Sequence, residues 1–243
     1  MEPLSLPRHG CGRKLGGLIQ SLVMGFARNV ERRIEQWVDG LSATIFRGGM
    51  PPVEIAERLI RQADLLVEDG AAGPTIPNSF TVRIRPKRLP RDADVNRLAH
   101  DLGVSLAQAA AERGWRTEGP ISVAVEPDPT VVSGGIKTEA TVAPGPLRGW
   151  GQLLAVHEGA GFELRANRVL VGRSTTSDVV LNDPDVSRSH AIVFRQGGRV
   201  WVDDLKSANG TRVNGASVDG EPVSISPGDE IAFGSALFSF RLV

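Results

Sequence analysis

The sequence has few of the residues that support redox, metal or covalent chemistry. Its 243 residues include no tyrosine, one cysteine (Cys11) and four histidines. A single cysteine excludes an intramolecular disulfide and is typical of proteins in a reducing compartment. No Cys/His spacing of a zinc site occurs, and no signature of a hydrolase, P-loop protein or kinase. We therefore expect no metal, no cofactor, no catalytic residue and no enzyme activity.

A net charge and a long apolar run are also lacking. Lys and Arg together number 28, as do Asp and Glu, so no overall field attracts nucleic acid or an anionic membrane surface. No stretch approaches the roughly 18 apolar residues of a membrane span. Residues 15–26 follow two basic residues as in a signal peptide, but glycines and polar residues dilute their hydrophobicity. We expect a cytoplasmic protein without membrane insertion, in which any anion-binding site is local.

The beginning of the chain has no amphipathic pattern. Proline and glycine are frequent there, which predicts a flexible leader over residues 1–21. The helical pattern begins just before Met24, so translation from Met24 is an alternative explanation. Both explanations predict that residues 1–23 can be removed without loss of stability or function.

Residues 22–143 have the pattern of an α+β domain. Apolar residues recur at spacings of three and four in three stretches and alternate with polar residues in three shorter ones. A Gly/Pro/Asn segment over 70–79 predicts a loop. The order α-α-β-α-β-β packs most simply with the helices on one face of a small sheet. The expected helices cover Phe26–Ile45, Pro51–Val67 and Asp92–Gly114, and the expected strands Phe80–Ile84, Ile121–Val125 and Lys137–Val142.

The rest of the chain changes to a period of two. Short alternating strands without a long helix predict an all-β sandwich over residues 150–243. Gly197-Gly198 and Asn214-Gly215 suit tight hairpin turns, because these residues accept positive φ. The intervening residues 144–149 form a short linker that places the two domains close together. The expected strands are Leu164–Val171, Ala191–Arg195, Val200–Asp203, Glu230–Phe233 and Leu237–Leu242.

Four short motifs follow one another within these strands. They are Gly172-Arg173, Ser187-Arg188-Ser189-His190, Asn209-Gly210-Thr211 and Asn214-Gly215. Each fragment alone is common, but their order within about 45 residues of short strands is not. Together they resemble the forkhead-associated (FHA) domain, a β-sandwich whose loops recognise phosphothreonine. The resemblance covers residues 150–243 and predicts a phosphorylated protein partner.

The resemblance also implies which residues bind the phosphopeptide. Arg173 is the principal phosphate ligand, Ser187 donates its hydroxyl, and Arg188 adds a second donor. The planar guanidinium of an arginine matches two phosphate oxygens at once. Asn209 holds the peptide backbone through its amide, which both donates and accepts.

Other residues of the motifs have structural roles in this interpretation. Gly172, Gly210, Asn214 and Gly215 supply backbone geometry, and His190 braces the loops rather than acting in catalysis. Two further positions bear on sequence preference. Ala208 replaces a threonine that is frequent in the family, which removes a hydroxyl and is expected to weaken binding or shift its preference. Asp185 lies in the loop that often selects the residue three positions after the phosphothreonine, where it would disfavour an acidic residue.

The first half resembles the N-terminal domain that precedes an FHA domain in actinobacterial proteins of the FhaA type. The matching stretches are residues 26–34, the helix that opens at Pro51, Pro77–Phe80, and Arg113–Trp115. The resemblance implies a non-enzymatic adaptor that binds phosphothreonine-containing products of bacterial Ser/Thr kinases. It further implies a connection with cell-wall synthesis and division, through membrane-anchored kinases or pseudokinases that recruit the adaptor.

Nucleic-acid binding by the first domain is the alternative function. Arg83, Arg85, Lys87, Arg88 and Arg91 form a local basic run. Aromatic residues that could stack on bases are absent from this strand face, and the charges of the domain balance. A solvated strand face is therefore the simpler interpretation, and no nucleic-acid partner is expected.

Overall fold

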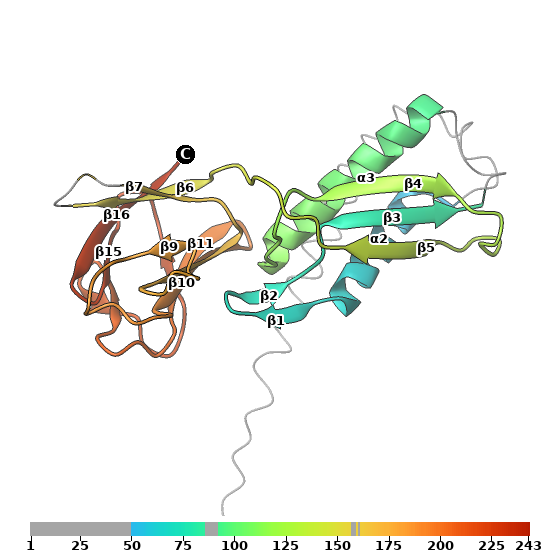
Figure 1. The fold of residues 1–243 in the computed structure, drawn as a ribbon. Coiled ribbons are helices and arrows are strands. Elements are labelled where there is room, and N and C mark those ends of the chain that lie inside the picture. The colour runs from blue at the N-terminus through green and yellow to red at the C-terminus, as the bar shows by residue number, and fades with distance from the viewer. Residues whose placement is uncertain (1–49, 86–91, 157–158, 160) are drawn as a thin grey trace, which may run out of the picture. The chain divides into compact units, whose positions relative to one another are not determined.

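The computed structural model describes residues 50–85, 92–156, 159 and 161–243 (Figure 1). The leader, the first expected helix and the basic residues at 87, 88 and 91 lie outside the described residues. No helix in the described part of the chain combines the length and the apolarity that a membrane crossing requires.

A three-stranded sheet forms the centre of the N-terminal part. β3 (Ser79–Ile84) lies between β4 (Ser122–Pro127), to which it is parallel, and β5 (Lys137–Thr141), to which it is antiparallel. α2 (Pro52–Leu65) and α3 (Asp92–Arg113) lie on the same side of this sheet (Figure 1). Alternate residues of β3 are buried, as expected for a strand with one face on the core. The predicted α+β arrangement with helices on one face is confirmed.

The ends of the two helices follow from their sequences. Pro52 occupies the first turn of α2, where a missing N–H costs nothing. Gly114 follows α3 with a φ of 69°, and the N–H of Trp115 donates to the carbonyl of Ala110 at 2.8 Å. A left-handed glycine after the last turn is a common helix stop, because it satisfies a terminal carbonyl.

The segment after α2 differs from the prediction. The helix ends at Leu65 rather than Val67, and a hairpin of β1 (Glu68–Gly70) and β2 (Gly73–Thr75) extends into the expected loop at 70–79. These strands have three residues each and no fully buried position. A hairpin this short has no alternating pattern from which it could be predicted. Its importance is in its position, because Ala72 between the two strands is buried.

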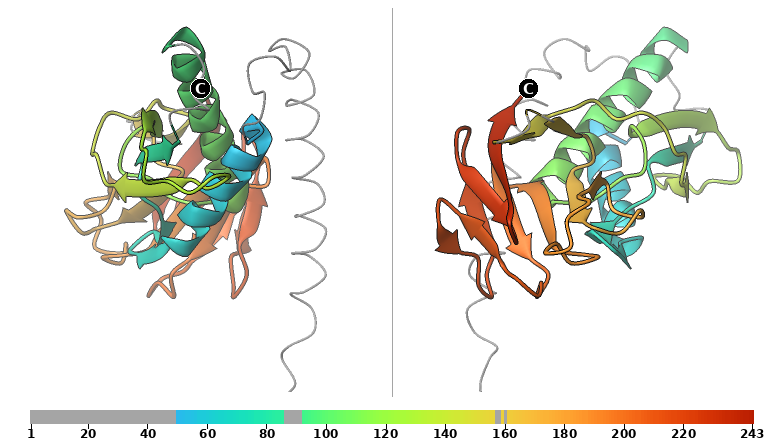
Figure 2. Two further views of the ribbon diagram at one scale, coloured as in Figure 1. Left: turned by 90° about the vertical axis from the view of Figure 1, so that its right-hand side faces the viewer. Right: turned by 60° about the vertical axis from the view of Figure 1, so that its left-hand side comes forward.

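The C-terminal part is the predicted all-β sandwich. One sheet has the order β14-β11-β10-β8-β9 and the other the order β13-β12-β15-β16-β6-β7, and the two sheets face one another (Figure 2). Apolar side chains between them, among them Phe233, Phe240 and Leu153, form the core. The strands are β6 (Gly151–Ala155), β7 (Gly161–Leu164), β8 (Arg168–Gly172), β9 (Val179–Val180), β10 (Ala191–Gln196), β11 (Arg199–Asp204), β12 (Thr211–Val213), β13 (Ala216–Ser217), β14 (Val223–Ile225), β15 (Glu230–Phe233) and β16 (Ala236–Leu242).

One predicted strand is in fact two. Residues 164–171 do not form a single strand, because the chain ends β7 at Leu164 and begins β8 at Arg168 in the other sheet. The apolar pattern does not mark such a change of sheet, since both strands contribute to the same core. The two predicted hairpin turns are confirmed. Gly197-Gly198 joins β10 to β11 and Asn214-Gly215 joins β12 to β13, each with two positive φ angles.

The five-stranded sheet is also covered on its outer face. Leu170, Ile192 and Phe194 point away from the sandwich core and are buried with Ala72 of the β1–β2 hairpin. β8 is buried along its whole length. Residues 49–243 form one compact unit. The outer face of the sandwich therefore packs against the N-terminal part. The exact boundaries of the domains at 143 and 150 stay a prediction.

Candidate functional site

Three loops meet at one end of the sandwich. The first loop (173–178) follows β8, the second loop (181–190) follows β9, and the third loop (205–210) follows β11. Backbone hydrogen bonds join the first to the second loop, from the N–H of Arg173 to the carbonyl of Ser187 at 2.9 Å and from Ser174 to Arg188 at 3.1 Å. The N–H of Ala208 joins the third loop to the second by donating to the Ser187 Oγ at 3.0 Å. All four expected binding residues lie on these loops.

Gly172 allows the first two loops to approach. A Cβ atom at this position would lie 2.1 Å from the carbonyl oxygen of Arg188 and 2.9 Å from the Ser177 Oγ. The first distance is to a backbone atom, which cannot move without displacing the second loop. Only glycine therefore fits before Arg173, because any side chain there would collide with the backbone of Arg188.

His190 connects the second and third loops through hydrogen bonds of its buried ring. Its ring is fully buried; the Nδ1 accepts a hydrogen bond from the N–H of Ser187 at 3.0 Å, and the Nε2 lies 3.2 Å from the carbonyl of Gly210. Because Nδ1 accepts, the neutral ring carries its proton on Nε2 and donates it to Gly210. Burial lowers the pKa of His190, although the Gly210 carbonyl and the charge of Asp204 act in the opposite direction.

Asp204 organises the third loop, and the sequence analysis did not single it out. Its carboxylate accepts from the Ser207 N–H at 2.9 Å, from the Ser207 Oγ at 2.7 Å and from the Thr211 Oγ1 at 2.6 Å. Burial alone raises the pKa of Asp204, but these hydrogen bonds outweigh it and the pKa is lowered. Asp and Ser are frequent in turns because their side chains bond to nearby backbone groups, which is the signal that could have found this pair.

The loops present donors that are available to an anion. Arg173 and Arg188 are exposed, and within the described ranges neither guanidinium forms an ion pair with an acid. The Arg173 Nε donates to the Val186 carbonyl at 3.2 Å, which orients the side chain. The Ser187 Oγ accepts from Ala208, so its own proton is left to donate. Lys206, in the third loop with a φ of 56°, is a further exposed cation that sequence analysis missed.

Asn209 and Asp185 lie side by side. The Asn209 Nδ2 donates to the Asp185 carbonyl at 2.9 Å and contacts the Asp185 Oδ1 at 3.5 Å, which leaves the amide oxygen for a peptide backbone. Asp185 is exposed, and its carbonyl would lie 2.5 Å from a Cβ atom at Gly234. The acid is thus held at the rim of the site, next to the residue expected to bind the peptide.

The arrangement suits binding rather than catalysis. It brings together hydrogen-bond donors and positive charge, and the buried histidine is engaged on both nitrogens. In the part of the chain that the structure describes, no group of His, Cys, Asp and Glu could hold a metal ion.

The basic strand of the N-terminal part has partners of its own. The Arg83 guanidinium forms ion pairs with Glu126 of β4, at 3.2 Å, and with Glu139 of β5. The hydrogen bond to Glu139 raises the pKa of Arg83. The charge of Arg83 is therefore balanced across the sheet, which removes it from the basic run that the nucleic-acid alternative needs.

Each half of the chain matches the model of a known protein family. The model of the FHA domain matches residues 169–234, and the model of the FhaA N-terminal domain matches residues 27–139. The oxoglutarate dehydrogenase inhibitor of Corynebacterium diphtheriae is 42% identical over 85 residues, which are 35% of this chain and 55% of that protein. The glycogen accumulation regulator GarA of Mycolicibacterium smegmatis is 40% identical over 85 residues, 35% and 50% of the two chains.

The similarity to each of these relatives covers about a third of the chain. The transcriptional regulatory protein EmbR of Mycobacterium tuberculosis is 31% identical over 87 residues, 36% of this chain and 22% of that protein. The chain thus spans between about a fifth and about half of the length of these relatives. A crystal structure of the FhaA FHA domain complexed with the intracellular domain of Rv3910 has 30% identity and a TM-score of 0.35, covering 37% of this chain and 99% of that chain. With both family models matched in this order, the chain is an FHA-domain protein of the FhaA type.

Proposed function

We propose that this protein is a non-enzymatic adaptor that binds phosphothreonine peptides through the three loops of its FHA domain. A phosphothreonine carries about −1.5 to −2 charges and three acceptor oxygens. The observation that carries the proposal is the convergence of Arg173, Ser187 and Arg188 at one loop junction. Both guanidinium groups are exposed, and neither forms an ion pair with an acid among the described residues. Charge-assisted hydrogen bonds from arginine are the usual means by which proteins bind phosphorylated motifs.

The partner in this proposal is a phosphorylated protein of a bacterial Ser/Thr kinase pathway. A relative, EmbR, has been solved in complex with a low-affinity phosphopeptide, and the FhaA FHA domain with an intracellular domain of another protein. The adaptor would act in the cytoplasm and be recruited to membrane-anchored kinases or pseudokinases that function in cell-wall synthesis or division. The four loop residues are the proposed ligands, with Asp185 and Ala208 influencing which peptide binds.

The direct test is calorimetry of the full chain with a phosphothreonine peptide library and its unphosphorylated counterpart. We expect binding of phosphorylated peptides only. Arg173→Ala should reduce the affinity at least tenfold, since it removes charge-assisted bonds of about 1.5–3 kcal/mol each. Arg199→Ala is a matched control, because this exposed arginine begins β11 at the end opposite the loops. A folded Arg173→Ala variant with unchanged affinity would refute the assignment of the site.

A further inference from the structure

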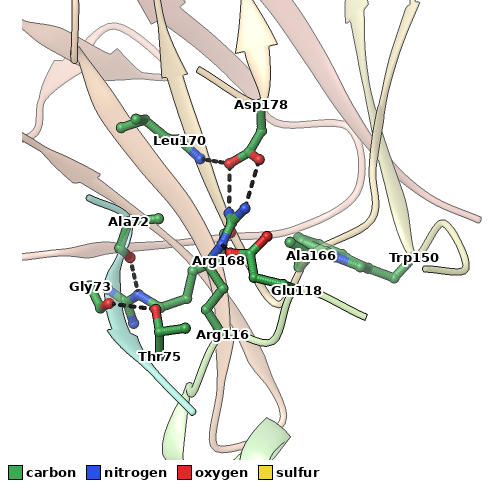
Figure 3. A network of polar contacts seen from close by, with 10 residues as sticks. All are labelled: Ala72, Gly73, Thr75, Arg116, Glu118, Trp150, Ala166, Arg168, Leu170 and Asp178. Atoms are coloured by element: carbon green, nitrogen blue, oxygen red, sulfur yellow. Dashed lines mark hydrogen bonds and ion pairs between the residues drawn. The ribbon is translucent and has the colours of Figure 1, made fainter. Parts of the chain in front are cut away.

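An ion pair connects the N-terminal part to the first loop of the site. Asp178 is the last residue of that loop, and both of its carboxylate oxygens accept from Arg116, at 2.7 and 2.9 Å (Figure 3). The same carboxylate accepts from the N–H of Leu170 in β8, at 2.7 Å. Arg116 precedes β4 and belongs to the segment matched by the FhaA N-terminal model. The contact therefore joins residues 62 positions apart.

Arg116 is held firmly on its own side. Its backbone pairs with the end of the β1–β2 hairpin, donating to the Pro74 carbonyl at 2.8 Å and accepting from Ile76 at 3.0 Å. Its guanidinium also donates to Glu118 at 2.9 Å and to the Arg168 carbonyl at 2.6 Å. The side chain is only 14% exposed. Burial alone lowers the pKa of Arg116, but the hydrogen bonds to Asp178 and Glu118 outweigh it, so the group stays charged.

The first loop has little other support on this side. A cavity of about 260 Å³ lies between the loop and the N-terminal part, lined among others by Thr176, Asp178, Leu170, Glu68 and Arg116. Apolar packing therefore does not fix the first loop on the side of the cavity. The bidentate ion pair between Arg116 and Asp178 joins the loop to the N-terminal part at the edge of the cavity. A partly buried Arg–carboxylate fork of this kind sets geometry as well as contributing energy.

The anchored end is directly linked to the phosphate ligands. Ser177, next to Asp178, is buried and donates its hydroxyl to the Arg188 carbonyl at 3.2 Å. Its N–H donates to the Ser174 carbonyl at 3.0 Å, and Ser174 in turn donates to Arg188. Displacement of Asp178 would thus be transmitted through Ser177 to the loop that carries Arg173 and to the backbone of Arg188.

We propose that Arg116 is a positioning residue of the phosphopeptide site, through which the N-terminal part holds the first loop in its binding conformation. This inference rests on the proposed function. By fixing Asp178, Arg116 orders the loop before the ligand arrives, so the entropy of ordering it is not lost on binding. The coupling is reciprocal, so bound phosphopeptide must strengthen the Arg116–Asp178 contact. The N-terminal part then contributes to affinity without touching the peptide.

The test compares five variants of the full chain by calorimetry with the tightest phosphothreonine peptide of the library. Arg116→Gln and Asp178→Asn should each weaken binding about three- to tenfold, and the double variant should lose no more than the worse single variant. Arg116→Lys should lose less, because lysine keeps the charge but not the bidentate geometry. Glu57→Gln is the control, since it removes an ion pair of the N-terminal part, with Arg61 within α2, that involves neither Arg116 nor the loop; its affinity should be unchanged.

Hydrogen exchange supplies a measurement that mere loss of stability would not alter. In the unsubstituted chain, peptide should increase protection of the amides of residues 114–118, and this effect should disappear in Asp178→Asn. Equal affinities of Arg116→Gln, Asp178→Asn and the unsubstituted chain, or additive losses in the double variant, would overturn this inference alone. If the unsubstituted chain binds no phosphopeptide, the proposed function and this inference both fall.

Discussion

His190 makes the binding loops dependent on pH. Its pKa is lowered by burial, so the folded protein favours the neutral ring and the unfolded chain, with a pKa of about 6.5, binds the proton more readily. Stability from this group is therefore fully present above about pH 6.5 and decreases as the pH falls below it. Protonation of Nδ1 in the folded protein would also remove the acceptor for the Ser187 N–H, so phosphopeptide affinity should fall at a lower pH than that at which stability begins to decline.

Chemical denaturation and calorimetry between pH 7.5 and 5 would measure both effects, the range being chosen around the ordinary pKa of about 6.5. His190→Gln is the informative comparison, because it should be less stable at neutral pH but nearly independent of pH in this interval. Asp204 does not confuse the result, since its lowered pKa affects stability only below about pH 4. A stability of the unsubstituted chain that does not decline towards pH 5 would contradict the role of a buried neutral histidine.

Gly172 is the residue at which a single methyl group should disrupt the site. A Cβ atom would lie 2.1 Å from the backbone of Arg188, so Gly172→Ala must push the first and second loops apart. We expect a loss of roughly 2–4 kcal/mol in the free energy of unfolding and loss of phosphopeptide binding.

The matched control for Gly172→Ala is Gly103→Ala. Gly103 lies within α3, where the nearest atom to a new Cβ is a methyl group of Val123 at 3.9 Å. Alanine in a helix should stabilise the protein by about 0.5–1 kcal/mol and leave binding unchanged. Urea denaturation measures both variants. Retained affinity in Gly172→Ala would show that the two loops can separate without consequence.

Sequence patterns led to the proposed binding residues but not to the residues that hold them. Arg173, Ser187 and Asn209 were found because they form short local motifs, and their contacts with the ligand stay a prediction. Arg116 and Asp178 could not be found in this way, since two charged residues 62 positions apart carry no local signal. His190 is an intermediate case, because its place in the motif was evident but one of its two hydrogen bonds, to Gly210, depends on the third loop.

At the level of elements, most of the longer strands were predicted well and very short strands were not. β3 and β10 to β11 appeared at the expected places because their side chains alternate or because glycine turns bound them. The β1–β2 hairpin was missed, although it covers the outer face of the sandwich. One signal of this cover was present in the sequence. Leu170, Ile192 and Phe194 are apolar at positions that a solvent-exposed sheet face would give to polar residues.

The covered face provides a prediction for the packing of these elements. Ile192 is 4% exposed and lies in the cluster with Ala72, Leu170 and Phe194. Ile192→Ala should lower the free energy of unfolding of the full chain by about 2–5 kcal/mol, as for other buried isoleucines. Val132→Ala is a suitable control, since Val132 is 72% exposed and its truncation should change stability little. A loss for Ile192→Ala as small as that of Val132→Ala would mean that the outer face is open to solvent.

At the scale of the whole molecule, contacts between the two parts are numerous and varied. Arg168 of β8 is buried over the Phe194 ring and donates to the carbonyls of Ala72 and Gly114. Asn167 donates to the Trp115 carbonyl at 3.1 Å, and Arg116 forms an ion pair with Asp178. These polar contacts surround the apolar cluster, so separating the two parts would expose unsatisfied buried groups as well as apolar surface.

The two parts should consequently unfold together. We expect scanning calorimetry to show one transition for the unit of residues 49–243, with equal calorimetric and van't Hoff enthalpies. Phosphopeptide at about 100 times its Kd should stabilise that entire transition by about 2.7 kcal/mol, whereas the unphosphorylated peptide should not shift it. Two transitions, of which phosphopeptide moves only one, would instead show that the FHA sandwich and the N-terminal part fold independently. The Asp178→Asn variant offers an intermediate case. Because it weakens the contact between the two parts, its unfolding transition should be broader than that of the unsubstituted chain without separating into two.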